Sequence, residues 1–158
     1  MTKDVYSLAI SIPGPKRSEP AENQDHCKNW EKDGWQLIVV ADGHGSATHS
    51  DSEVGSRFAC ESTLEVVEAY LHDISGDAEE VFPDLKSFWE QEAFPKIHQL
   101  WNRKVDEDLL EKTKNNDPNI QNQKQISFSR AKVGEGVRYG TTLLCVLSYK
   151  NIIALGQV

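Results

Sequence analysis

The stretch that decides the fold is residues 36–46, with the sequence QLIVVADGHGS. Its first half is an apolar run, residues 37–41, and a continuous run of this length predicts a strand buried on both faces. The run turns polar at Asp42. We therefore expect the Asp42 carboxylate at the rim of a packed sheet, held by rigid backbone but within reach of solvent. A carboxylate in that position suits a metal ligand or an acid–base group.

Glycines flank the histidine that follows this carboxylate. Gly43 and Gly45 stand on either side of His44, and we expect them to adopt backbone angles closed to other residues and to let an ion or phosphate approach the main chain. An Asp-Gly turn of a β-hairpin is the simpler interpretation. It fits poorly, because residues 46–50 form a small polar segment with no strand pattern, and a helix follows.

Composition restricts the class of protein. The 158 residues are one domain's worth of chain, 38% of them are hydrophobic, and the net charge is −8. This balance argues against a nucleic-acid partner or an anionic membrane surface, which need clustered Lys and Arg. Three cysteines without a CxxC pattern predict reduced thiols in a cytoplasmic protein. We see neither a signal peptide nor an apolar stretch of transmembrane length.

The first half of the chain predicts strand, loop, strand and helix in that order. Alternating apolar residues at 6–12 predict a half-buried strand, Asn23-Gln24-Asp25 lies in a loop, and residues 30–34 read as a turn. Residues 50–53, SDSE, match a capping box that opens a long amphipathic helix. Gly76 is the expected stop of this helix.

The next part predicts a helical insert and a loop, together about residues 76–136. Residues 84–112 are helical in pattern, but Pro95 should divide them into two helices or kink one. Residues 113–125, TKNNDPNIQNQKQ, have almost no apolar content. We expect them to form a mobile surface loop.

The last part predicts a β-hairpin. Residues 143–149 and 152–155 are apolar strands joined by the two-residue turn Lys150-Asn151, and Thr141-Thr142 read as strand residues on a polar face. The second strand is followed only by the three residues up to Val158. The sequence therefore looks cut short, and we expect association through the open sheet edge.

Two carboxylates are the candidate metal ligands. If the fold brings Asp25 and Asp42 together, their oxygens suit Mg²⁺ or Mn²⁺, and the Gly43 carbonyl could add a further ligand. His44 is better suited to proton transfer, because its ordinary pKa lies near neutrality. A turn or capping role explains Asp25 equally well, and a lone His in a glycine loop is usually only solvated. A zinc site is a weaker alternative, since its candidate ligands match no compact Cys/His spacing; they are His26, Cys27, His44 and His49.

Four segments together resemble a known family. Residues 23–25 (NQD), 39–46 (VVADGHGS), 52–59 (SEVGSRFA) and 139–144 (YGTTLL) occur in the order found in type 2C, metal-dependent (PPM) protein phosphatases. Gln-Asp in the first block, and Gly-Ser after the histidine, resemble the bacterial branch. The resemblance implies that residues 1–158 are the N-terminal portion of a single phosphatase domain.

The resemblance also implies a fold and a reaction. The fold would be α+β, a four-layer α/β/β/α sandwich of two antiparallel sheets flanked by helices. The substrate would be phosphoserine or phosphothreonine in a protein, hydrolysed with two Mg²⁺ or Mn²⁺ ions bridged by water. Asp42 would contact both ions and Gly43 would offer its carbonyl. Asp25 would hold metal-bound water, and His44 would protonate the leaving alkoxide.

Three departures from the family pattern oppose full activity. Gln24 replaces a metal-binding Glu found in many members, and Pro20 replaces a phosphate-binding Arg for which Lys16 or Arg17 could substitute. The later metal-binding aspartates of the family would lie beyond Val158. We therefore expect this chain alone to be a weak catalyst. A phosphatase-like binding or regulatory module is the alternative.

Overall fold

The residues that the structure describes form one antiparallel sheet with helices on one face. The computed structural model describes residues 7–12, 23–114 and 136–158 of the chain. The elements in chain order are β1 (His26–Lys32), β2 (Trp35–Ala41), α1 (Ser52–Leu71), α2 (Ala78–Phe88), the π-helical η1 (Trp89–Ala93), α3 (Phe94–Lys114), the 3₁₀ turn η2 (Gly136–Tyr139), β3 (Leu144–Tyr149) and β4 (Ile152–Gln157).

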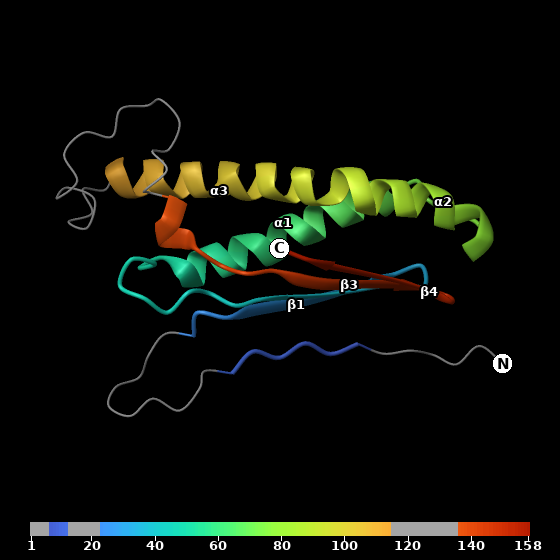
Figure 1. The fold of residues 1–158 in the computed structure, drawn as a ribbon, viewed down its shortest axis with the longest axis horizontal. Coiled ribbons are helices and arrows are strands. Elements are labelled where there is room, and N and C mark those ends of the chain that lie inside the picture. The colour runs from blue at the N-terminus through green and yellow to red at the C-terminus, as the bar shows by residue number, and fades with distance from the viewer. Residues whose placement is uncertain (1–6, 13–22, 115–135) are drawn as a thin grey trace.

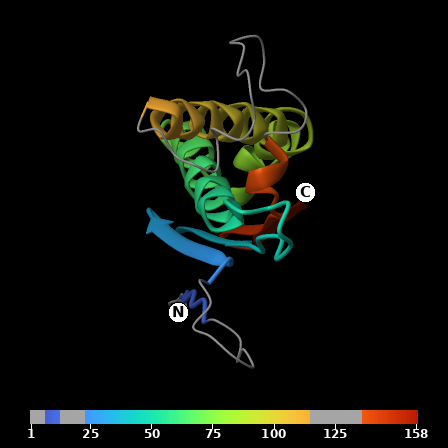
Figure 2. The ribbon, with the colours of Figure 1, turned by 90° about the vertical axis from the view of Figure 1, so that its left-hand side faces the viewer.

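The sheet has the strand order β1-β2-β3-β4, and every neighbouring pair is antiparallel. Figure 1 shows α1 and α3 stacked on one side of the sheet, whereas the N-terminal segment runs along the other side. Figure 2, turned by 90°, shows the helices as a layer above the twisted strands. The predicted α+β class is confirmed.

Strand β2 is buried on one face only. Trp35, Leu37 and Val39 are 3%, 1% and 0% exposed and face the helices, whereas Val40 is 41% exposed on the opposite face. The prediction of a strand buried on both faces is therefore wrong for this structure. The reason is the layering, because described helices cover only one side of the sheet.

A tight turn joins β1 to β2. Asp33 and Gly34 have φ values of 52° and 82°, as expected for the two central residues of a type I′ hairpin turn. The predicted turn at residues 30–34 was too wide, since Trp30 lies within β1. Strand β1 itself was missed, because its sequence HCKNWEK is mostly polar.

The N-terminal segment differs from its prediction. Residues 7–12 form no strand, and Leu8, Ile10 and Ile12 are exposed. Side chains from the rest of the chain hold the segment instead of a backbone ladder: Asn29 Nδ2 donates to the Ser7 carbonyl at 3.3 Å. Position 6 of the predicted strand lies outside the described residues.

Helix α1 begins and ends at other residues than predicted. It starts at Ser52 after Asp51, no side chain caps its N-terminus, and it ends at Leu71. The predicted capping box does not form, because the N-cap residue is Asp51 and not Ser50, whose Oγ donates to Asp51 Oδ2. Gly76, the predicted stop, lies just before α2 with a φ of 138°.

The predicted interruption near Pro95 takes the form of a wider helical turn. The π-helix η1 lies between α2 and α3 and ends two residues before Pro95, which is consistent with a proline that cannot donate a backbone hydrogen bond. Thr113, predicted to open a loop, belongs to α3. Residues 115–125 of that predicted loop lie outside the described residues.

The C-terminal hairpin is confirmed. Lys150 and Asn151 form the turn between β3 and β4, and β4 extends to Gln157. Cys27, Cys60 and Cys145 are all free thiols, as predicted.

Candidate metal site at the open end of the β1–β2 hairpin

The hairpin register brings the two candidate carboxylates face to face. His26 of β1 is paired with Ala41 of β2. Asp25 and Asp42 are the next residue outward on each strand, so they lie opposite each other where the ladder ends. The two-residue turn fixes this pairing, because a slip of one residue would move every side chain to the other face.

The two carboxyl groups interact directly. The pKa of Asp25 is raised above its ordinary value by burial, by the contact between its carboxyl and that of Asp42, and by the Asp42 charge. A hydrogen bond from the Gly43 backbone N–H opposes this rise. Among the ion pairs of residues 7–12, 23–114 and 136–158, none involves either carboxylate. Two adjacent anions that no described cation pairs with are an environment that a bound metal ion would stabilise.

The Asp42 backbone is held by a segment that lies about a hundred residues later. Thr142 N–H donates to the Asp42 carbonyl at 2.9 Å, and Thr141 Oγ1 donates to the same oxygen at 3.0 Å. A β-bridge also joins Gly43 to Thr141. The prediction that Thr141 and Thr142 are strand residues is therefore wrong: they precede β3 and anchor the site.

Helix α1 holds the other side of the site. Ser56 Oγ donates to the Gln24 carbonyl at 2.6 Å, and Asn23 Oδ1 accepts a hydrogen bond from the Asp25 N–H at 3.3 Å. The residue pattern of α1 gave no sign of the contact between Ser56 and Gln24, because the two residues are distant in sequence.

Gly43 is required for space and not for its backbone angles. A Cβ atom at Gly43 would lie 2.4 Å from the Gln24 carbonyl oxygen, whereas one at Gly45 would meet only the Gln24 side chain at 3.1 Å. Neither glycine has a positive φ, so the special backbone angles that we expected do not explain why glycine occupies these positions.

A pocket opens beside the carboxylates on the outer face of the sheet. It has a volume of about 550 Å³, and Asp25 and Asp42 lie on its wall. Ile10 and Ile12 of the N-terminal segment form one side, and Val40 of β2 forms another. The pocket is thus partly polar, at the carboxylates, and partly apolar.

His44 lies at a different opening. Its backbone N–H donates to the Gly140 carbonyl at 3.0 Å, and its exposed ring lies against the His49 ring, with centroids 4.9 Å apart. The ring lines a second pocket of about 500 Å³, with Phe94 and Trp101 of α3. The structure therefore brings Asp25, Asp42 and Gly43 together but places the His44 side chain at a different pocket, although its expected role in proton transfer requires it near the carboxylates.

The zinc alternative finds no support. His44 and His49 are adjacent, but His26 and Cys27 line the carboxylate pocket instead. Within the described parts of the chain, no group of three or more His, Cys, Asp or Glu side chains could hold a metal ion.

The carboxylate pair fits a hard divalent cation. Asp25 and Asp42 offer carboxylate oxygens, which Mg²⁺ and Mn²⁺ prefer. Among the described residues, no third His, Cys, Asp or Glu side chain joins this pair, and the neighbouring residue Gln24 carries no charge. Pro20, which departs from the expected phosphate-binding Arg, and its possible substitutes Lys16 and Arg17 lie outside the described residues.

Comparison with known proteins identifies the family. The family model described as Protein phosphatase 2C matches residues 16–158, which include both site aspartates. No curated protein and no solved structure matches the chain. Across the part of the chain that the structure describes, no helix is both long and apolar enough to span a bilayer. The chain belongs to the protein phosphatase 2C family.

Proposed function

We propose that the chain carries the metal site of a phosphatase that hydrolyses phosphoserine and phosphothreonine in proteins. The observation that carries the proposal is the pair Asp25 and Asp42, whose carboxyl groups contact each other beside an open pocket. The family membership supports phosphoryl hydrolysis as the reaction.

The residues at this end of the hairpin would bind Mg²⁺ or Mn²⁺. Asp42 and the Gly43 carbonyl oxygen would hold the metal, and Asp25 would hold it directly or through bound water. The bound ions would supply Lewis-acid activation of water for in-line attack on phosphorus. The hydrogen bonds from Thr141 and Thr142 to Asp42 would keep its carboxylate oriented.

His44 would donate a proton to the leaving oxygen of the substrate. Its ring is exposed, and no hydrogen bond within the described residues fixes it. The proton transfer requires this ring to turn toward the carboxylate pair. His44→Gln should therefore lower kcat more than it changes Mn²⁺ affinity.

The outer face of the sheet supports the four-layer architecture of a complete domain. Val40, Leu144, Ile153 and Leu155 are all exposed on strands β2, β3 and β4. An apolar sheet face of this kind is normally covered in a folded domain. A second sheet on this face would complete a sandwich of which residues 1–158 form the N-terminal part. The three free thiols favour a cytoplasmic location.

Hydrolysis of a phosphothreonine peptide tests the function. We expect slow turnover by the chain that depends on Mn²⁺ and is abolished in Asp42→Asn. Asp106→Asn, an exposed position on α3, should retain the wild-type rate. Turnover that is independent of Mn²⁺, or that survives in Asp42→Asn, would contradict the proposal.

A phosphatase-like binding module is the second candidate. Gln24 favours it, because a neutral amide contributes no charge to the metal site, and only two acidic side chains meet there among the described residues. This function predicts that the chain binds Mn²⁺ and a phosphopeptide without hydrolysing it.

A further inference from the structure

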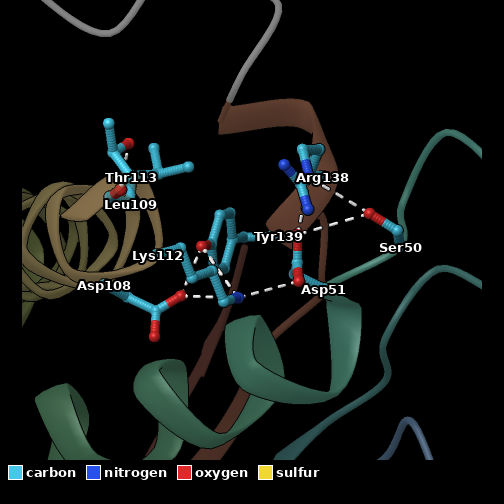
Figure 3. A network of polar contacts seen from close by, with 8 residues as sticks. All are labelled: Ser50, Asp51, Asp108, Leu109, Lys112, Thr113, Arg138 and Tyr139. Carbon is cyan, nitrogen blue, oxygen red and sulfur yellow. Dashed lines mark hydrogen bonds and ion pairs between the residues drawn. The ribbon is translucent and has the colours of Figure 1, made fainter. Parts of the chain in front are cut away.

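A polar network ties three elements together away from the carboxylate pair. Figure 3 shows Asp51, at the start of α1, between two cations from other elements. Arg138 Nε of η2 lies 2.6 Å from one Asp51 oxygen, and Lys112 Nζ of α3 lies 2.8 Å from the other. The Asp51 carboxylate is used for these contacts and does not cap α1.

The network also includes a buried tyrosine. Lys112 Nζ lies 2.7 Å from Asp108 Oδ2, and the Tyr139 hydroxyl donates to the same oxygen. Burial lowers the pKa of Lys112, but its hydrogen bonds to Asp108 and Asp51 outweigh that effect and raise it. Burial and the neighbouring Asp108 raise the pKa of Tyr139. Two cations and two anions therefore balance, and the tyrosine remains a neutral donor.

Tyr139 is held closely against α1. Its side chain is fully buried, and a Cβ atom at Gly55 would lie 1.9 Å from the Tyr139 carbonyl oxygen. The Asp51 N–H also donates to the Arg138 carbonyl at 2.9 Å. Both the side chains and the backbone of η2 are therefore fixed to the first turn of α1.

The segment directly after Tyr139 contacts the site. Gly140 accepts the hydrogen bond from the His44 N–H at 3.0 Å, and Thr142 donates to the Asp42 carbonyl at 2.9 Å. The path from the Asp51 network to both candidate site residues is thus three residues of chain. A shift of η2 would move the hydrogen-bond partners of Asp42 and His44 together.

Simple stabilisation of the helix pair does not require this network. Lys104 of α3 makes comparable ion pairs with α1, to Glu65 at 2.6 Å and to Glu61 at 3.7 Å. Lys104 and Lys112 are similarly shielded, with side chains 19% and 23% exposed. Only the Lys112 network includes η2. Partly buried ion pairs are also poor evidence for stability and are better attested as devices that fix one arrangement.

We propose that Asp51, Lys112 and Arg138 are positioning residues for the metal site. They hold η2 so that residues 140–142 keep the Asp42 backbone and the His44 backbone in place. This inference rests on the proposed function in one respect only, namely that the aligned Asp42 carboxylate binds a metal ion.

The test compares two lysines that both join α3 to α1. In Lys112→Met and Arg138→Met, we expect the Thr142 and His44 amides to exchange about 10- to 100-fold faster relative to the Val67 amide within α1. We expect Mn²⁺ affinity to fall by a similar factor, the usual effect of losing a group that orients a metal ligand. Lys104→Met should change neither quantity. Arg138→Lys retains the positive charge, so it should fold even if Arg138→Met does not. Its amide exchange rates and Mn²⁺ affinity should lie between those of the wild type and those of Arg138→Met.

Each outcome separates the two proposals. Equal exchange of the Thr142 amide in Lys112→Met and Lys104→Met would overturn the positioning role, whatever the metal data show. Faster exchange with unchanged Mn²⁺ affinity would also overturn it, because the position of residues 140–142 would then not affect metal binding by the Asp42 carboxylate. If the wild-type chain does not bind Mn²⁺, the proposed function fails, and the exchange data alone then decide the role of the network in holding the Asp42 backbone.

Discussion

Asp25 occupies an unfavourable position in the protein without metal. Its pKa is raised above the ordinary 3.8 by burial and by the Asp42 carboxylate. A group whose pKa is raised on folding contributes stability below pH 3.8 and loses that contribution as the pH rises through the raised value. At neutral pH, folding therefore holds a carboxylate beside another carboxylate. A bound cation would reverse this cost.

Asp25→Asn should therefore have opposite effects without and with metal. Without metal, the free energy of unfolding of the variant should rise relative to that of the wild type as the pH rises from about 4 to about 7. The gain should be no more than about 1 kcal/mol, because solvent screens the repulsion between the two exposed carboxylates. With saturating Mn²⁺, the wild type should be stabilised and the variant much less. Urea unfolding at both pH values measures this, with Asp106→Asn as the control. If the variant is less stable than the wild type at about pH 7 without metal, the Asp42 carboxylate does not destabilise Asp25.

The two glycines around His44 should differ in their tolerance of a methyl group. At Gly43 the added Cβ meets the backbone oxygen of Gln24, which cannot move away easily, whereas at Gly45 it meets a flexible side-chain end. We expect Gly43→Ala to lower the free energy of unfolding by about 1–3 kcal/mol and Gly45→Ala to change it by less than about 0.5 kcal/mol. Equal effects in thermal unfolding would show that the close contact at Gly43 is not needed.

Among the elements, the β1–β2 hairpin sets the position of the candidate metal site. The turn at Asp33 and Gly34 sets the pairing of His26 with Ala41. That pairing in turn sets Asp25 opposite Asp42 at the far end of the ladder. The turn and the site lie at opposite ends of one ladder, so they are separated by the length of a single seven-residue strand.

Gly34→Ala should destabilise the hairpin by about 1 kcal/mol, because its φ of 82° is unfavourable for a residue with a side chain. Space is not the reason, since the added Cβ would meet the Tyr149 ring at an ordinary 3.7 Å. Asp33→Asn should be neutral or stabilising, because Asn-Gly suits this turn. Thermal unfolding of the two variants measures the difference. A similar loss of unfolding free energy in Gly34→Ala and Asp33→Asn would show that the positive φ of Gly34 is not what determines the stability of the turn.

Sequence patterns predicted the elements whose residues are mainly apolar. The apolar run before Asp42 predicted β2, and the apolar residues around Lys150-Asn151 predicted β3 and β4. Strand β1 was missed because polar residues dominate it. The Asp33-Gly34 dipeptide was the available signal, since it favours a two-residue hairpin turn.

The proximity of the candidate ligands could be predicted from the sequence, but the residues that hold them in place could not. Asp25, Asp42 and Gly43 were identified from short motifs, and the structure brings them together. Arg138 and Ser50 lie 88 residues apart, so no local pattern could reveal that η2 contacts the start of α1. The position of the His44 ring was also unpredictable, because it depends on the path of residues 140–142.

In the molecule as a whole, the two faces of the sheet differ in how far their apolar side chains are buried. The helices bury one side of the sheet, whereas Ile153 and Leu155 of β4 are 76% and 65% exposed on the other side or edge. Exposed apolar strands at an edge promote association. We therefore expect the chain to self-associate through β4 as its concentration rises.

Ile153→Lys should weaken this association. The side chain is largely exposed, so the substitution should change the free energy of unfolding by less than about 0.5 kcal/mol, while a lysine on an edge strand opposes pairing. Phe82→Lys, at an exposed apolar position on α2, is the matched control. Sedimentation velocity over a range of concentrations measures the effect. A wild-type chain that stays monomeric throughout would show that the edge does not associate.

Asp25 and Asp42 are the proposed ligands of a divalent metal ion. Anomalous diffraction from crystals of the chain grown with saturating Mn²⁺ tests this proposal, because the signal locates the ion itself. We expect a peak coordinated by a carboxylate oxygen of Asp42, with Asp25 bound to the same ion directly or through one water. The absence of a peak between these carboxylates, or a strongest peak at His44 and His49, would show that they do not form the metal site.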